Sequence, residues 1–328
     1  MKKPTMGDIA ERLNVSTMTV SKCFKNSPDI SKTMQEKVMH VAREIGYIPP
    51  KKKRHNVLIL TKDEFLSKGD SFYTELHSRL NEQAFEHSLQ LSLSVVNQTE
   101  EPLFIQNFNF EHYDAVMLMG QFIRPFVESL HSLDLPIVLL DFYYHDMNID
   151  AVVSNNFFGS FDATAHLIKY NHEDIVFVGT LKSTSSINDR YFGYYKAMLE
   201  AGLESKIRVI KDRNGLGIHK TFDLPDPLPT AFVCNNDHTA YLLIKQLKKR
   251  GVSIPGEISV TGFDDVKYAE LSNPTITTMR VSRSTMAKEA IALVHKKIMD
   301  EVKTHSARRI ALDCTLIDRE STAERPKE

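Results

Sequence analysis

Hydrophobic residues recur at helical spacing in three short segments within the first 47 residues, and a hydroxyl side chain precedes each segment. These hydroxyl residues are Thr5, Ser16 and Ser31, and each is a favoured helix N-cap. Asn14-Val15 suits the turn between the first two segments, and Gly46 suits the left-handed residue that ends the third. The three apolar faces are Ile9, Ala10 and Leu13; Val20, Cys23 and Phe24; and Val38, Val41, Ala42 and Ile45. This pattern predicts three short helices packed around a small core.

The second predicted helix leaves short polar and basic side chains outside that core. Thr17, Met18, Ser21 and Lys22 face outward, and side chains of this size suit a nucleic-acid groove. Periodicity alone fits a small helical bundle with a solvated polar face equally well. Charge favours the first interpretation: residues 1–54 hold 12 of the 41 Lys and Arg residues but 5 of the 42 Asp and Glu residues, a net charge of about +7, whereas the remainder carries about −8. A basic head on an acidic body indicates a phosphate-binding module joined to a domain with another task.

From residue 56 onward, short β-type runs alternate with longer amphipathic segments. The predicted strands are 57–60, 89–96, 115–119, 136–140, 151–154, 175–179, 230–234 and 258–263, and the predicted helices are 72–87, 157–169, 187–201, 238–250 and 282–300. This alternation predicts parallel sheets flanked by helices. Because there are more strands than one compact sheet usually holds, we expect two α/β lobes.

Composition narrows the class of protein. A hydrophobic content of 42% supports real cores, no run approaches the ~20 apolar residues of a membrane helix, and the N-terminal MKKPTMGD lacks the apolar stretch of a signal peptide. We therefore expect a cytoplasmic protein with no membrane partner. Cys23, Cys234 and Cys314 are far apart in apolar contexts, which argues against a disulfide framework or a zinc site.

Signals for catalysis in the body are weak, and signals for ligand binding are better. The sequence has no dinucleotide-binding glycine fingerprint, phosphate-binding loop or nucleophile elbow, and its histidines lack metal-site spacing, so no enzyme, metal or cofactor is expected. Polar residues do follow the predicted strands: Asp141, Asn236, Asp237, Asp264 and Asp265. Each aspartate alone is more often a turn former or helix cap. Together they form a candidate site, because ligands of such folds lie at the carboxyl ends of strands.

Longer ordered motifs run through the whole chain. They are D-I-A (8–10), N-V-S-T-M-T-V-S-K (14–22), S-K-T-M-Q-E-K-V (31–38), I-G-Y-I-P (45–49), D-R-Y-F-G-Y (189–194), C-N-N-D (234–237), V-T-G-F-D-D (260–265), N-P-T-I-T-T-M-R-V (273–281) and R-E-S (319–321). In this order the chain resembles the lactose-repressor (LacI/GalR) family of bacterial transcription regulators, and the resemblance covers nearly its whole length.

The resemblance implies a fold and a domain organisation. It implies a helix-turn-helix headpiece at 1–50, a basic linker at 51–55, and a two-lobed effector-binding and dimerisation domain of the periplasmic-binding-protein type at 56–328. The first lobe is expected at about 56–152 and 280–305, and the second at about 154–276 and 308–321. Three crossovers are expected between them.

The resemblance also implies functional residues in the body. The arginine of the family's R-x-x-G-[YF] motif matches Arg190, and the first aspartate of G-[FY]-D-D matches Asp264; in the family both contact the effector. Matching by position adds Asp141 and Asn236, and it places Phe72 where an aromatic ring often packs against the ligand. A planar guanidinium with carboxylate acceptors suits the vicinal hydroxyls of a sugar, and it also suits a nucleobase or nucleoside, so the effector class stays open.

In the headpiece, the resemblance implies binding of a near-palindromic DNA operator by a homodimer. We expect Thr17, Met18 and Lys22 to read base edges in the major groove. The expected phosphate and other DNA contacts are Ser16, Thr19 and Ser21, together with Thr5, Asn26, Lys51, Lys52, Lys53 and Arg54.

The chain departs from the family pattern in three places. Lys22 stands where arginine is usual, which replaces a planar fork by a point charge and predicts a different operator. Asn155-Asn156 stands where Asp-Asn is usual, and Asn171-His172 where Gly-His is usual; we expect both to alter local turns more than function. After Pro50 the basic run 51–54 leads directly into the first strand, without the hinge helix whose leucine wedges into the minor groove in the family. That run fits a flexible linker and a set of phosphate contacts equally well.

The sequence therefore predicts a cytoplasmic, nucleoid-associated transcription regulator. We expect a repressor of a carbohydrate-utilisation operon, controlled by a sugar or sugar derivative bound between the lobes. A purine- or nucleoside-responsive regulator of the same family is the alternative. A solute-binding protein needs an export signal and has no use for a basic head, and a sugar-modifying enzyme needs a catalytic constellation.

Overall fold

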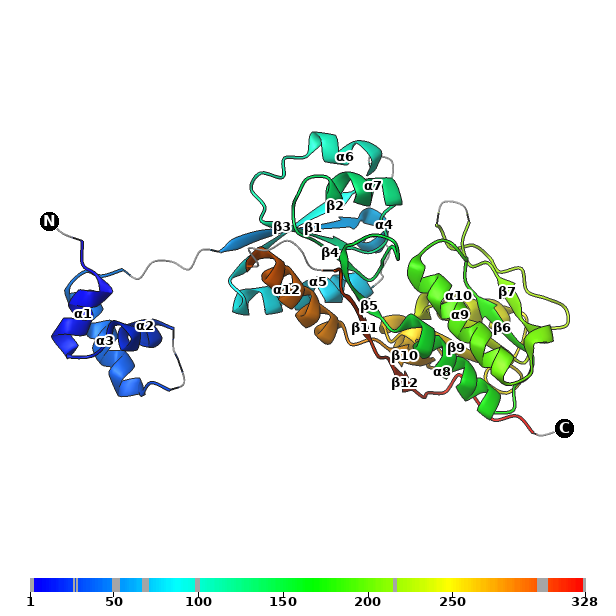
Figure 1. Cartoon of the computed structure of the whole chain (residues 1–328). Coiled ribbons are helices and arrows are strands. Elements are labelled where there is room, and N and C mark those ends of the chain that lie inside the picture. The colour runs from blue at the N-terminus through cyan, green and yellow to red at the C-terminus, as the bar shows by residue number, and fades with distance from the viewer. Residues whose placement is uncertain are drawn as a thin grey trace. The chain divides into compact units, whose positions relative to one another are not determined.

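The structure is a computed structural model of the chain, and it describes residues 3–25, 27, 29–48, 54–66, 71–97, 101–214, 217–299 and 306–326. The chain divides into two compact units, Met1–Lys53 and Arg54–Glu328. The first unit is the headpiece and the second is the body (Figure 1).

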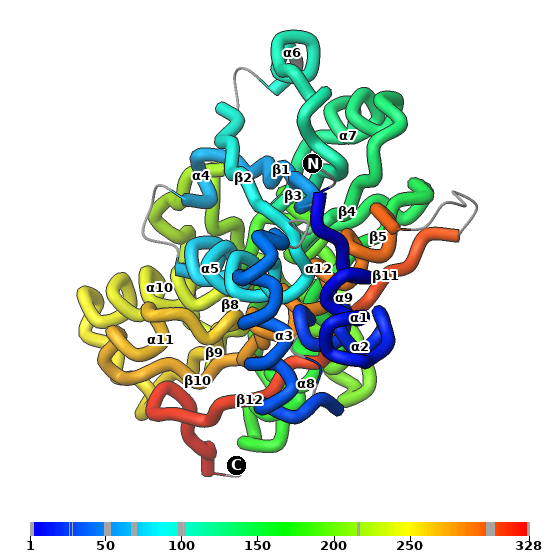
Figure 2. The backbone as a smooth tube through the Cα atoms, turned by 90° about the vertical axis from the view of Figure 1, so that its left-hand side faces the viewer, coloured from blue at the N-terminus to red at the C-terminus, as the bar shows by residue number. Residues whose placement is uncertain are grey.

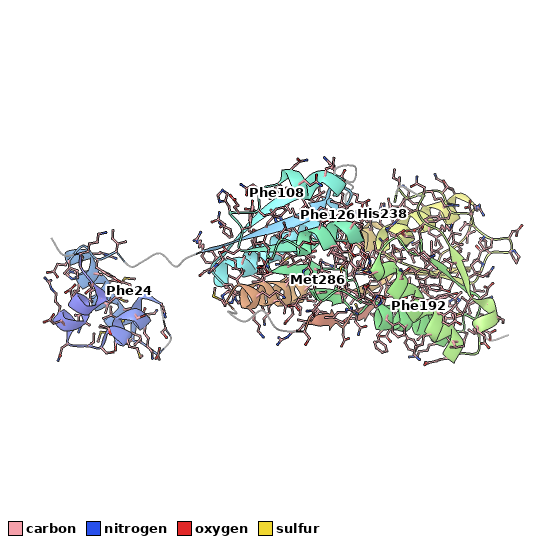
Figure 3. All side chains as sticks on the ribbon, turned by 45° about the horizontal axis from the view of Figure 1, so that its top comes forward. Phe24, Phe108, Phe126, Phe192, His238 and Met286 are labelled. Carbon is pink, nitrogen blue, oxygen red and sulfur yellow. The ribbon has the colours of Figure 1, made fainter. Side chains whose placement is uncertain are left out.

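The headpiece is a bundle of three helices, α1 (Met6–Leu13), α2 (Thr17–Phe24) and α3 (Lys32–Glu44). Each begins after its predicted cap, because the side-chain oxygens of Thr5, Ser16 and Ser31 each accept a backbone N–H from three residues further on. Their apolar faces enclose a core in which Phe24, labelled in Figure 3, packs with its ring centroid 5.6 Å from that of Tyr47. The buried members of this core are Ile9, Ala10, Val20, Cys23, Val38 and Ala42. The predicted three-helix unit is confirmed.

The body holds two six-stranded sheets, which confirms the expectation of two α/β lobes but exceeds the eight strands that the sequence predicted. The first has the strand order β11-β5-β4-β3-β1-β2 and the second the order β12-β10-β9-β8-β6-β7, with every pair parallel except β10 and β12. The strands of the first sheet are β1 (His55–Lys62), β2 (Leu89–Val96), β3 (Ala115–Met119), β4 (Ile137–Leu140), β5 (Asp150–Ser154) and β11 (Arg309–Leu312). Those of the second are β6 (Ile175–Val178), β7 (Arg208–Ile210), β8 (Ala231–Cys234), β9 (Ser259–Asp264), β10 (Thr277–Arg280) and β12 (Thr315–Ile317).

Helices cover both faces of the first sheet, which explains why its central strands β3 and β4 are apolar throughout. Val57 and Ile59 point toward α5 (Ser71–Glu86) and α12 (Arg283–Met299), while Leu58 and Leu60 point toward α6 (Glu101–Asn107) and α7 (Arg124–His131). Figure 1 shows these two helix pairs on opposite sides of the strands, with the short α4 (Asp63–Leu66) directly after β1.

The second sheet is covered in the same way. The helices of this lobe are α8 (Asn156–Lys169), α9 (Ser185–Glu200), α10 (Asp237–Lys249) and α11 (Lys267–Leu271), with a short 3-10 turn, η1 (Glu204–Lys206). Phe177 and Val233 pack under α8 and α9, and Phe232 packs under α10. Gly193 allows α8 and α9 to approach closely, because a Cβ at this position would lie 2.0 Å from the carbonyl oxygen of Phe157.

The chain crosses between the lobes three times, between β5 and α8, between β10 and α12, and between β11 and β12. One predicted boundary needs correction. The range 308–321 was assigned to the second lobe, but β11 pairs in parallel with β5, Arg309 opposite Ala151, and so extends the first sheet. Only the chain after Leu312 enters the second lobe, as the orange-to-red end of the tube shows in Figure 2. The pairing of this short strand is non-local, so its own pattern could not reveal it.

One apolar cluster runs through the region where the lobes join. Phe263 and Met279 of the second lobe belong to the same buried cluster as Met286 and Ala287 of α12. Met286 is labelled in Figure 3. The two lobes are therefore connected by a shared core as well as by the three crossovers.

Candidate effector site and DNA-binding surface

Arg190 is the centre of a polar cluster in the second lobe. It is 5% exposed, and α9 points its guanidinium at the carboxyl ends of β8 and β9. Its Nε donates to Asn156 Oδ1 at 2.7 Å, its Nη2 to Asp264 Oδ1 at 2.8 Å, and its Nη1 to the carbonyl oxygen of Asn235 at 2.5 Å. The guanidinium carbon lies 3.8 Å from the ring centroid of Phe263. These contacts fix the planar fork in one orientation.

Carboxylates from both lobes act on this arginine. Burial disfavours the charge of the guanidinium, but the charges of Asp264 and Asp141 outweigh that effect and raise the pKa of Arg190 above its usual value. Asp141 follows β4 of the first lobe, has a φ of 69°, and accepts a hydrogen bond from the hydroxyl of Tyr73 at 2.7 Å. The two strand-end aspartates expected to share a ligand thus lie on opposite lobes and act on the same arginine.

Asp264 and Asp265 are consecutive but serve different partners. Both have positive φ values, 98° and 52°, which L-residues adopt at a cost in backbone energy. Asp265 is held by Arg280 Nε at 2.6 Å and by Arg319 Nη2 at 2.7 Å, and although burial opposes its charge these hydrogen bonds lower its pKa. The turn therefore sends Asp264 toward Arg190 and anchors the strand end through Asp265.

Two of the predicted site residues have structural roles: Asn236 caps a helix and Phe72 packs in a core. The side chain of Asn236 caps α10 by accepting a hydrogen bond from the backbone N–H of Thr239 at 2.8 Å. Phe72 is 3% exposed and packs in the core of the first lobe, edge-on to Tyr73, which is the residue that reaches Asp141. Their expected contacts with an effector remain predictions.

Four residues of the cluster were not predicted as site residues. Asn156, Asn235 and Phe263 lie within sequence features described above, and Tyr73 directly follows the predicted Phe72. Asn156 was expected to affect only a local turn. Its hydrogen bond with Arg190 shows that it also orients the central guanidinium.

Arg283, on the crossover that enters α12, links this cluster to the first lobe. Its Nε donates to Glu75 Oε2 at 2.8 Å, and its Nη1 donates to the carbonyl oxygen of Asp264 at 2.8 Å. Its guanidinium carbon lies 5.9 Å from the ring centroid of Phe72. Arg283 therefore connects the backbone of Asp264 to Glu75 of α5.

In the headpiece, the exposed side of α2 carries the predicted DNA-contacting residues. Thr17 and Met18 are exposed, Met18 to 69%, and Ser21 and Lys22 are half-buried. Ser16 Oγ accepts the backbone N–H of Thr19 at 3.0 Å and lies 2.9 Å from Thr19 Oγ1. Both hydroxyls thus stand at the N-terminus of α2, where an anion is favoured.

The other predicted DNA contacts lie elsewhere. Thr5 Oγ1 donates to Asp8 Oδ2 at 2.8 Å within the capping box of α1. Arg54 is exposed and is the first residue of the body. Asn26, Lys51, Lys52 and Lys53 lie outside the described residues, as does the hinge segment whose helix was expected to be missing, so these expectations stay sequence predictions.

Within the described residues, no group of three His, Cys, Asp or Glu side chains is arranged to hold a metal ion. None of the helices described is long and apolar enough to cross a membrane.

A three-helix headpiece joined to a two-lobed α/β body, with polar side chains gathered at strand ends, is the architecture of a ligand-responsive DNA-binding regulator. Comparison with known proteins agrees. Residues 5–50 match the model for bacterial regulatory proteins of the lacI family, and residues 164–322 match the model for a periplasmic binding protein-like domain. The headpiece thus has the DNA-binding domain of the lacI family and the body has a periplasmic binding protein-like domain, as in lacI-family regulators. The chain is accordingly a DNA-binding transcription regulator and not an enzyme, as the sequence predicted.

Relatives and solved structures cover almost the entire chain. The transcriptional repressor PurR of Histophilus somni is 28% identical over 316 residues, which span 92% of this chain and 94% of the relative. The repressor CytR of Escherichia coli is 26% identical, with coverage of 98% and 97%. Among structures, the regulator CelR in complex with cellobiose has a TM-score of 0.70 at 22% identity (97% and 99% covered), and the lac repressor dimer bound to operator has 0.68 at 17% (98% and 100% covered).

Proposed function

We propose that this regulator is a homodimeric repressor of a carbohydrate-utilisation operon, released from or held on its operator by a sugar or sugar derivative bound between the lobes. The observation that carries the proposal is the buried pair of Arg190 and Asp264, with Asp141 of the opposite lobe acting on the same guanidinium. Sugar-bound neighbours of the same fold, such as the CelR–cellobiose complex, support it.

The chemistry of this cluster suits a ligand with several hydroxyl groups. A hydroxyl both donates and accepts, so one sugar hydroxyl can accept from Arg190 while it donates to Asp264. A neighbouring hydroxyl has a second carboxylate available in Asp141. Because Asp141 and Asp264 belong to different lobes, a ligand that bonds to both favours one relative position of the lobes over others.

The purine- or nucleoside-responsive alternative has one observation in its favour. The rings of Phe65 and Tyr73 lie 4.8 Å apart between centroids, and the Tyr73 hydroxyl bonds to Asp141. An aromatic pair beside a carboxylate suits a planar base, which stacks on a ring and donates hydrogen bonds from its edge.

On the DNA side, we propose that two headpieces bind the halves of a near-palindromic operator through α2. Thr17, Met18 and Lys22 would read bases, and Ser16, Thr19 and Ser21 would hold phosphates, because the latter group lies nearer the helix start. Residues 51–55 serve as the basic linker between headpiece and body. The lac repressor dimer bound to operator supports the dimeric arrangement. A protein with this task acts in the cytoplasm, on the nucleoid.

Thermal-shift measurements on the full chain test the effector class directly. The panel contains free mono- and disaccharides, sugar phosphates, purine bases and nucleosides, because a ligand at one hundred times its Kd adds about 2.7 kcal/mol of stability. We expect stabilisation by a free or modified sugar. Stabilisation by a base or nucleoside alone would establish the alternative, and a response to neither class would contradict the proposed site.

A further inference from the structure

Two side-chain hydrogen bonds join the lobes beside α9, away from the three crossovers. The hydroxyl of Tyr143, in the loop after β4, donates to the carboxylate of Asp189, with both Oδ1 and Oδ2 at 3.0 Å. Close by in the chain, the backbone N–H of Ser185 donates to Gln121 Oε1 at 3.0 Å. Tyr143 and Gln121 belong to the first lobe, and Ser185 and Asp189 belong to the first half of α9 in the second.

The first lobe holds both of its members in position. The guanidinium carbon of Arg309, at the start of β11, lies 3.6 Å from the ring centroid of Tyr143. Gln121 Nε2 donates to the hydroxyl of Tyr144 at 3.1 Å, and that hydroxyl donates to the carbonyl oxygen of Phe122 at 2.7 Å. Tyr143 and Gln121 therefore do not have to be ordered when the lobes meet, which lowers the entropic cost of forming the two hydrogen bonds.

In the second lobe, Asp189 immediately precedes Arg190. Its carboxylate is half-buried, and burial raises its pKa, although the hydrogen bond from Tyr143 and the charges of Arg309 and Arg190 oppose that shift. A carboxylate in this position is stabilised by the phenol only while the lobes are in contact. Arg190, the next residue, is anchored to Asp264, so a ligand acting on Arg190 acts on the same helical turn.

We propose that Tyr143 and Asp189 form a latch that holds the two lobes together. Only the regulatory role of the latch rests on the proposed function, since an effector that changes the relative position of the lobes would have to break or keep this hydrogen bond. It differs from the Arg283 contacts with Glu75 and Asp264, which lie on a crossover and so stay near the pivot of any lobe movement.

The Ser185 amide provides a readout. It lies in the first turn of α9, where backbone N–H groups have no acceptor within the helix, and its hydrogen bond goes to Gln121 across the lobes. We would measure its hydrogen exchange in the full-length, ligand-free and DNA-free protein. Tyr143→Phe should accelerate this exchange by roughly tenfold, because the half-buried charged acceptor loses its donor.

Three further variants make the test specific. Asp189→Ala should match Tyr143→Phe, and the double variant should exchange no faster than either, because both remove one interaction. Asp189→Asn, whose amide oxygen still accepts the phenol proton, should keep the protection. Tyr170→Phe is the matched control, since the Tyr170 hydroxyl donates to Asp318 at 3.1 Å within the second lobe alone.

The proposal is overturned if Ser185 exchanges at the wild-type rate in folded Tyr143→Phe or Asp189→Ala, or if Tyr170→Phe accelerates it equally. If Tyr143→Phe does not fold, the two Asp189 variants decide the question. No sugar takes part in the measurement, so absence of a sugar response in the thermal-shift panel leaves the latch result standing, and a failed latch leaves a sugar response standing.

Discussion

Lys22 of α2 and Asp29 of the loop before α3 form an ion pair on the surface of the headpiece. The hydrogen bond from Lys22, followed by one from Ser27, lowers the pKa of Asp29 to about 2, so its carboxylate is charged at any pH at which the protein works. The lysine expected to read a base is therefore already neutralised, and a carboxylate stands beside the proposed DNA-binding surface. This acid limits how strongly the headpiece attracts phosphates.

Asp29→Asn should therefore strengthen DNA binding. Without the carboxylate, Lys22 is free to meet DNA and one repulsive charge is removed, so we expect a few-fold gain in affinity on cognate and scrambled duplexes alike at low salt. Fluorescence anisotropy at several salt concentrations measures this. Glu44→Gln is the matched control, because Glu44 pairs with Arg12 at 2.9 Å between α1 and α3. A loss of affinity in Asp29→Asn would mean that the pair orients Lys22 productively.

Lys22→Ala should change which sequence is preferred. A side chain that contacts a base edge contributes roughly 1–3 kcal/mol of discrimination at one base pair. Selection of binding sites from a random library should show relaxed preference at one position of each half-site. Ser21→Ala, which removes an expected phosphate contact, should weaken all sequences by a similar factor. Equal weakening of cognate and scrambled DNA by Lys22→Ala would place this lysine on the backbone instead.

Arg190→Ala and Asp264→Ala should each abolish the effector response and leave operator affinity nearly unchanged. Loss of a charged hydrogen-bond partner costs roughly 1.5–3 kcal/mol, which corresponds to an affinity for the effector that is roughly 10- to 160-fold weaker. Arg280→Ala is the control, because Arg280 pairs with the neighbouring Asp265 but is half exposed. The measurement is the shift in melting temperature, and in DNA anisotropy, with the sugar that stabilises the wild type. A normal response in both site variants would show that the effector binds elsewhere.

Gly193→Ala should destabilise the body. The added methyl group would lie 2.0 Å from the carbonyl oxygen of Phe157 and 2.9 Å from the backbone nitrogen of Phe161, so α8 and α9 must move apart. Overpacking of this kind costs roughly 1–3 kcal/mol, and a clash with backbone belongs at the upper end. Urea unfolding followed by circular dichroism gives the value. Phe192→Ala, at a neighbouring ring that is 55% exposed, should change stability far less.

The basic linker should make operator binding steeply salt-dependent without a sharp central kink. The sequence between Pro50 and Asn56 offers no apolar side chain that can be inserted at a base step. Each lysine or arginine contact removed from residues 51–54 in each subunit should lower the slope of log K against log salt by about 0.9. Circular-permutation gel shifts should show little bending. A strongly bent complex in that assay would refute the prediction.

The headpiece was predictable because its signals are local. Thr5, Ser16 and Ser31 each act on a backbone N–H three residues away, so the sequence contains both partners of every cap. The assignment of β11 to the wrong lobe has the opposite cause. Its partner β5 lies more than 150 residues earlier in the chain, and only the folded sheet brings Arg309 beside Ala151.

Within the candidate site, the family resemblance named Arg190 and Asp264 as site residues, but it gave neither their pairing with each other nor the roles of adjacent residues. Neighbours on a helix point about 100° apart, so matching by position could not show that Tyr73, and not Phe72, reaches Asp141. It also could not show that Asn235 acts through its backbone carbonyl while the side chain of Asn236 caps α10. Such assignments depend on side-chain orientation, which the fold decides.

The apolar cluster in which Phe263 and Met279 meet Met286 and Ala287 separates two requirements on this protein. The aspartates proposed to meet a ligand lie on strand-end turns, whereas the region where the lobes join is made of buried apolar side chains. Substitutions on the turns can therefore change which effector is bound without disturbing the core that joins the lobes. Protein engineering aimed at a new effector should change the turn residues and keep this apolar cluster intact.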